Sequence, residues 1–102
     1  MMSADVEERI ENRIWRYRQI KGLNQSDLAF VINQKGTAQI SRYEKGLVIS
    51  DFERIVKISH VLEVEPKELY PELIEQWQSE AEKRAGELEK IKQSKNNRHA
   101  FK

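Results

Sequence analysis

Apolar residues recur at helical spacing along almost the whole chain, and this pattern constrains the fold more than any other feature. Val6, Ile10, Ile14 and Tyr17 form the first such stripe. No segment sustains an alternation of polar and apolar residues, and only four glycines and two prolines are available to separate strands. The pattern therefore predicts an all-α fold.

Stop and start signals divide the N-terminal part of this pattern into two helices. The first is expected from about residue 4 to residue 21, because Gly22 suits the left-handed conformation that follows a helix C-terminus. Asn24 can cap a second helix over residues 25–32, and Asp27 can complete its capping box.

Two further helices follow a polar turn at residues 33–36. The third is expected over residues 37–45 and is ended by Gly46. Ser50 and Glu53 have the spacing of a capping box, which predicts the start of a fourth helix. The apolar face of this helix would comprise Phe52, Ile55, Val56, Ile58 or Ser59, and Leu62.

The remainder of the chain predicts a short helix and a long one. Pro66 suits the first turn of the short fifth helix, and an amphipathic helix is expected over residues 71–93. Arg84 on its apolar seam and Gly86 make this helix a weak coiled coil, and the basic tail 94–102 is expected to be disordered. The seam comprises Ile74, Trp77, Ala81, Leu88 and Ile91.

Composition limits the chain to one small domain with a helical appendage, and it narrows the possible functions. The longest apolar run covers five of the 102 residues, against roughly 20 for a membrane span. The N-terminus lacks a signal peptide and cysteine is absent, so a cytoplasmic protein is expected. No catalytic motif is present, and His60 and His99 have no ligand set around them. We therefore expect no enzyme, metal or cofactor.

Charge is unevenly distributed although the net charge is only +1. Residues 9–46 contain eight basic and three acidic residues, residues 51–82 contain three and nine, and residues 83–102 contain seven and two. A basic block that includes the second and third predicted helices therefore precedes an acidic one.

The third predicted helix has one face that suits DNA. At about 100° per residue, an inward Ile40 places Tyr43 and Glu44 on the buried side. The opposite face then carries Ala38, Ser41, Arg42 and Lys45, flanked by Thr37 and Gln39. Hydrogen-bonding, methyl and cationic groups without an acid match what the major groove of DNA offers.

Three segments in order carry a resemblance to a known family. They are RYRQIKGLNQSDLA at 16–29, ISRYEKG at 40–46 and SDFERIVKISHVLEVEPKELY at 50–70. Together they resemble the Cro/C1-type, XRE-like helix-turn-helix DNA-binding transcriptional regulators. The resemblance implies a five-helix phage-repressor-like helix-turn-helix bundle over residues 1–70, with its helix-turn-helix core at 25–45 and an additional C-terminal amphipathic helix.

The resemblance also implies roles for individual residues. Base contacts would come from Thr37, Ala38, Gln39 and Arg42. Phosphate contacts would come from Gln25, Lys35, Ser41 and Lys45. Arg18 and Glu44 would form a partly buried structural salt bridge.

The sequence departs from the family pattern at three places. The turn before Ile40 is one residue longer than the commonest spacing, which can rotate the recognition helix. Glu63 replaces the usual glycine after the fourth helix, which predicts strain or a shifted cap. The loop after Gly46 is apolar where the family is often basic, which suggests a subunit contact.

The leading hypothesis is a sequence-specific regulator of double-stranded DNA, a repressor that acts as a homodimer on half-sites about one helical turn apart. Candidates for the dimer contact are Leu47, Val48, Ile49, Trp77 and Leu88. The alternative is a protein-interaction module, or an antitoxin, that binds a protein partner through the C-terminal helix. Trp15 and Trp77 favour core or dimer packing over stacking on single-stranded nucleic acid.

Overall fold

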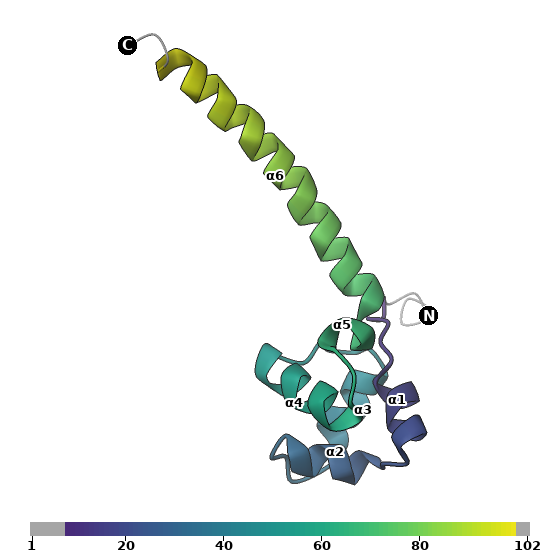
Figure 1. Ribbon diagram of the computed structural model, residues 1–102. Coiled ribbons are helices and arrows are strands. Elements are labelled where there is room, and N and C mark those ends of the chain that lie inside the picture. Colours follow the sequence, from purple (N-terminus) through teal and green to yellow (C-terminus); the bar gives the residue numbers. More distant parts are fainter. Residues whose placement is uncertain (1–7, 100–102) are drawn as a thin grey trace.

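The computed structural model describes residues 8–99, and this part of the chain is helical without strands, as predicted. Five short helices form a bundle, and the sixth leaves it as a long rod (Figure 1). The helices are α1 (Ile14–Lys21), α2 (Gln25–Val31), α3 (Ala38–Glu44), α4 (Phe52–Leu62), α5 (Pro66–Leu69) and α6 (Pro71–His99). None of these helices has the length and apolar character needed to cross a bilayer.

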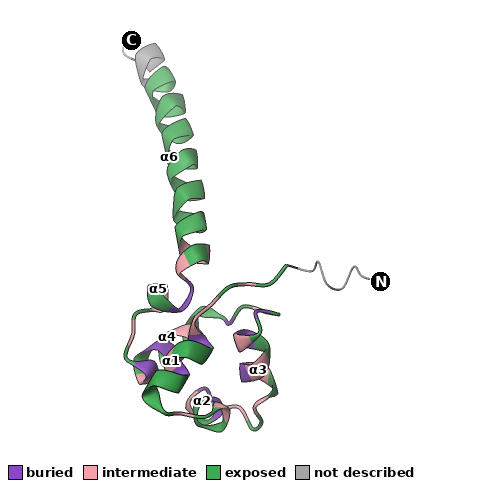
Figure 2. Cartoon of the chain, turned by 90° about the vertical axis from the view of Figure 1, so that its right-hand side faces the viewer, coloured by how far each residue is buried: buried purple, intermediate pink, exposed green. Residues whose placement is uncertain are grey.

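The core of the bundle receives at least one buried side chain from each of its five helices (Figure 2). Ile14, Ile40 and Tyr43 lie on the faces that the sequence predicted as buried, as do Ile58 and Leu62 of α4. Val56, which was placed on the same face of α4, is exposed. The buried apolar set is Ile14, Leu28, Ala29, Ile32, Ile40, Tyr43, Ile58, Leu62, Leu69 and Tyr70. Burial of this set is the main force that holds α3 in a fixed position.

Residues 8–12 form an extended segment outside any helix, and Arg13 is the N-cap of α1 (Figure 1). The predicted helix start near residue 4 is therefore wrong for the described part of the chain, and Val6 lies outside the described residues. The Asn12 amide donates to the Ile10 and Tyr43 carbonyls, at 3.0 and 2.9 Å. The Arg13 amide donates to the Leu69 carbonyl, at 2.8 Å. The Asn12 bonds come from its side-chain Nδ2 atom, whereas the Arg13 bond takes up a backbone amide. Because this backbone amide bonds to a distant carbonyl, it is not available to a helix that would include the residues before it.

Gly46 makes this extended segment possible. Its φ of +75° ends α3, and a Cβ at this position would collide with the backbone of Ile10. The Ile10 amide instead donates to the Gly46 carbonyl at 2.9 Å. Gly46, which the sequence predicted as a helix stop, therefore also allows the N-terminal segment to pack against the end of α3.

Helix α4 begins one residue later than its predicted capping box. Asp51, not Ser50, is the N-cap, and its carboxylate accepts the Arg54 amide at 2.9 Å. Ser50 is buried, and Phe52 is largely exposed although it was placed on the apolar face. Glu63 ends the helix in the left-handed conformation, with a φ of +61°. The helix therefore ends with the backbone geometry that glycine usually provides, and the backbone of Glu63 is strained.

Helix α6 extends to His99, so residues 94–99, predicted as part of a disordered tail, are helical, and 100–102 lie outside the described residues. No glycine or proline follows Gly86, and basic residues near a helix C-terminus interact favourably with its dipole.

Trp15 on α1 is exposed, which excludes the core packing expected as one of its two roles.

Candidate nucleic-acid interface

Helices α2 and α3 are joined by a turn that the predicted polar segment forms. Asn24 and Asp27 make the predicted reciprocal capping box at the start of α2, with both bonds at 2.9 Å. After Ile32, Asn33 takes a φ of +65°, a conformation that asparagine tolerates better than most residues. The longer turn is thus accommodated by a left-handed residue, and α3 begins at Ala38.

Helix α3 has the orientation that the helical layout predicted. Ile40 and Tyr43 are fully buried, whereas Ala38, Arg42 and Lys45 are exposed. Thr37, Gln39 and Ser41 are partly exposed at the flanks, and Lys35 is exposed in the preceding turn. The structure therefore brings the predicted base-contacting residues to one outward side of the bundle.

A buried ion pair fixes this orientation. The Arg18 Nε and Nη2 atoms donate to the Glu44 carboxylate at 2.6 and 3.0 Å, and the two side chains are only 8% and 6% exposed. Arg18 Nη1 also donates to the Leu23 carbonyl, at 3.1 Å. The hydrogen bond to Glu44 raises the pKa of Arg18 above its ordinary value. The predicted salt bridge thus ties α1 to the end of α3.

Gln25 joins this pair from the start of α2. Its Nε2 atom donates to Glu44 Oε1 at 3.0 Å, and its side chain is partly buried. Glu44 therefore receives bonds from α1 and α2 together, and the three helices that present the interface are connected at one carboxylate. Gln25 therefore braces the end of α3 through Glu44, and its contact with phosphate stays a prediction.

Gln39 and Thr37, at the start of α3, differ in whether their side chains form hydrogen bonds within the bundle. Gln39 Nε2 lies 3.4 Å from the Tyr43 hydroxyl, a long hydrogen bond that a base could replace. Thr37 is the N-cap of α3, but its hydroxyl makes no capping bond.

Arg9 is a cation near the interface that the sequence analysis missed. Its Nη1 atom donates to the Lys45 carbonyl at 3.1 Å, directly after the last turn of α3, and its side chain is exposed. This contact depends on the extended N-terminal segment, and no local pattern around Arg9 signals it.

The apolar loop after α3 is only partly available as a subunit contact. Leu47 and Ile49 are exposed, but Val48 packs partly against the core of its own bundle. Of the other predicted contact residues, Trp77 and Leu88 lie exposed on α6.

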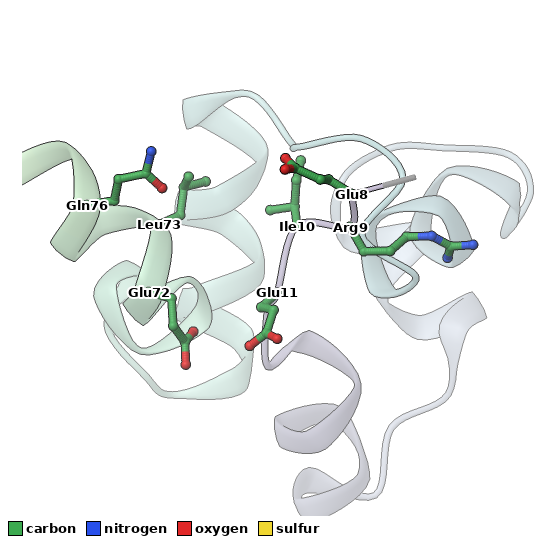
Figure 3. Close-up of a pocket in the computed structure, with 7 residues that line it drawn as sticks. All are labelled: Glu8, Arg9, Ile10, Glu11, Glu72, Leu73 and Gln76. Carbon is green, nitrogen blue, oxygen red and sulfur yellow. The ribbon is translucent and has the colours of Figure 1, made fainter. Parts of the chain in front are cut away.

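A hollow of about 440 Å³ lies where residues 8–11 meet the start of α6 (Figure 3). Glu8, Glu11 and Glu72 contribute carboxylates to its lining, against the single guanidinium of Arg9. Glu72 also accepts a bond from Arg13 at 2.9 Å. This acidic lining disfavours contact with phosphate.

Helix α3 is held against the bundle by a buried ion pair and exposes a polar and cationic face, and a capped helix and a turn precede it. This arrangement defines a helix-turn-helix DNA-binding domain. The sequence matches the family described as helix-turn-helix over residues 16–69, more than half of the chain. The chain therefore belongs to the Cro/C1-type, XRE-like helix-turn-helix family of DNA-binding regulators. The comparisons with curated proteins and with solved structures found no match.

Proposed function

We propose that the protein is a sequence-specific transcriptional repressor that inserts α3 into the major groove of double-stranded DNA as a homodimer. The outward face of α3 carries the proposal: Ala38, Arg42 and Lys45 are exposed while Ile40 is buried. Within the described side chains of residues 8–95, neither Arg42 nor Lys45 forms an ion pair. Both cations are thus free for a nucleic acid.

The side chains on this face divide into two roles. Arg42 can donate a bidentate pair of hydrogen bonds to guanine, Gln39 can pair with adenine, and the methyl of Ala38 can contact thymine. Thr37 is the fourth base-contacting candidate. Phosphate contacts are proposed for Gln25, Lys35, Ser41 and Lys45.

Selection of bound sites from a random duplex pool tests sequence specificity directly. Gel shifts on the selected site then compare Arg42→Ala with Lys45→Ala. Loss of a bidentate guanine contact costs about 1 to 3 kcal/mol and relaxes preference at one base pair. Loss of a phosphate contact weakens all sequences alike and lowers the salt slope by about 1. Lys67→Ala, an exposed lysine of α5, is the control and should change neither quantity.

Unchanged affinity in both α3 variants would show that another face binds DNA. Failure to enrich any sequence would remove the specificity from the proposal. Half-sites about 34 to 36 Å apart in the selected DNA would support the homodimer. Loss of reporter expression on operator binding would support repression.

A second candidate function is a protein-interaction module or antitoxin that holds its partner through α6. The exposed Trp77 and Leu88 on this helix favour it. A module without DNA binding would show no salt-sensitive affinity for duplex DNA at two salt concentrations, whereas an antitoxin that represses its own operon would bind both DNA and toxin.

A further inference from the structure

Helix α6 carries an apolar seam that, beyond the first turns, no other described residue of the chain covers. Ile74 is half-buried against the bundle, and every described residue from Glu75 to Lys95 is exposed (Figure 2). Trp77, Leu88 and Ile91 are each about half exposed, at 49%, 52% and 53%. Trp77 and Leu88 are eleven residues apart and Leu88 and Ile91 three, so all three lie on one side of the helix.

The charges of α6 are separated along its length. Residues 71–82 contain four acidic residues and no basic one, whereas residues 83–95 contain five basic and two acidic residues. The N-terminal half of the helix is therefore complementary to the C-terminal half of another copy, and each half repels its own equivalent.

We propose that α6 pairs with α6 of a second copy in an antiparallel orientation, centred between Ala81 and Arg84. This inference rests on the homodimer in the proposed function and adds its contact surface and geometry. In this register Trp77 packs on Leu88 of the second copy and Ile91 covers the exposed part of Ile74. At the centre, the small Ala81 leaves room for the aliphatic stem of Arg84.

A parallel pair would place identical residues opposite each other. The Arg84 side chains would then meet at the seam, as would the Lys95 side chains one and a half heptads later, and both layers would join like charges. Antiparallel pairing separates the Lys95 side chains and lets Arg84 keep its bond to Glu87, at 3.0 Å in the same helix.

The base of α6 adds to the charge complementarity. Glu8 and Glu11 of the extended segment lie beside Glu72 around the hollow of Figure 3. In the antiparallel register the end of the second helix that carries Lys92 and Lys95 approaches this acidic base. The bundle and the helix thus contribute charge of the same sign at the same place.

The proposed register also fixes where the two bundles lie. With a rise of about 1.5 Å per residue, the two Pro71 residues lie about 35 Å apart along the rod. The two bundles are then at opposite ends of the pair, beyond the two Pro71 residues, and are related by a two-fold axis across it (Figure 1).

Spin-label distances in the full-length protein test the orientation, because the absence of native cysteine allows single-site labelling. The two labelled variants are Ser79→Cys and Gln93→Cys. These positions are two heptads apart on the outer side of α6, away from the seam. In the antiparallel dimer the two labels at 93 are about 32 Å apart along the axis, and the two at 79 about 10 Å. The measured distance at 93 should therefore exceed that at 79 by roughly 10 to 15 Å.

Equal distances at the two positions would indicate parallel helices and overturn the proposal. The absence of a dipolar signal, the result for a monomer or for a helix reserved for another protein, would also overturn it. Adding Leu88→Asp should abolish the signal, whereas Glu89→Ala, off the seam, should preserve it. These measurements need no DNA, so a gel shift with the same variants shows separately whether DNA binding has failed.

Discussion

The bond network around Glu44 makes a strong prediction about stability. Replacement of Glu44 by alanine removes both bonds to Arg18 and the bond from Gln25. The Arg18 side chain, only 8% exposed, would keep only its bond to the Leu23 carbonyl. The Arg18 guanidinium would then be buried at the edge of the core without a negative charge to pair with it.

Breaking a buried ion pair in this way costs about 3 to 5 kcal/mol. Small domains have a total stability of about 5 to 15 kcal/mol, so the loss is a large fraction of it. In a bundle of this size each kcal/mol shifts the melting temperature by roughly 4 to 8 °C. Glu44→Ala should therefore lower the melting temperature by at least about 12 °C.

The pair between Glu53 and Lys57 provides a matched control. Its length of 2.7 Å is similar, but its side chains are 73% and 45% exposed, and its partners are one helical turn apart on α4. Exposed pairs contribute less than about 1 kcal/mol. Glu53→Ala should therefore have a small effect, because Lys57 stays solvated when its partner is removed.

Thermal unfolding and urea unfolding, each followed by far-ultraviolet circular dichroism, measure the melting temperature and the free energy of unfolding of both variants. The double replacement Arg18→Met with Glu44→Leu should recover most of the loss, because a buried ion pair is often replaced by apolar residues at little cost. Equal losses in Glu44→Ala and Glu53→Ala would refute the reasoning, as would a double variant less stable than Glu44→Ala.

Two further predictions concern Tyr70 and Glu63. Burial raises the pKa of Tyr70 to about 12 from its ordinary 10.0, and its hydroxyl has no hydrogen-bond partner of good geometry among the described residues. Because the folded pKa is the higher one, this stabilisation is complete below pH 10.0 and is lost as the pH rises towards about 12. The free energy of unfolding should therefore fall by about 2 kcal/mol less in Tyr70→Phe than in the native chain when the pH is raised from roughly 9 to 12, as measured by denaturant unfolding at both pH values. Glu63→Gly should stabilise by about 0.5 to 1 kcal/mol, since it relieves the left-handed strain. Glu63→Ala keeps the strain and loses the 2.9 Å pair with Lys21, so it should be slightly less stable than the native chain in the same denaturation assay.

Local signals were sufficient for the helix-turn-helix core. The Asn24 capping box, the helix stop at Gly46 and the inward Ile40 all appear where the sequence predicted them. Each depends on residues within one helical turn, where side-chain caps, glycine conformation and periodicity act independently of the rest of the fold.

Longer-range contacts account for the errors. The sequence predicted a helix where residues 8–12 are extended, and it gave no sign that Arg9 would lie beside the end of α3. It also placed Phe52 on a buried face, although the packing of α4 leaves this residue exposed. In each case a partner far along the chain, or its absence, decided the outcome.

The sequence by itself thus determined the all-α class, the helices around the turn and the composition of the outward face of α3. Only the tertiary structure decided the path of the N-terminal segment and added the bond from Gln25 to the predicted pair of Arg18 and Glu44. The physical reason is that helix signals are set by neighbours three or four residues apart. The backbone amide of Arg13 instead donates to the carbonyl of Leu69, and this acceptor comes within reach only after the bundle has formed.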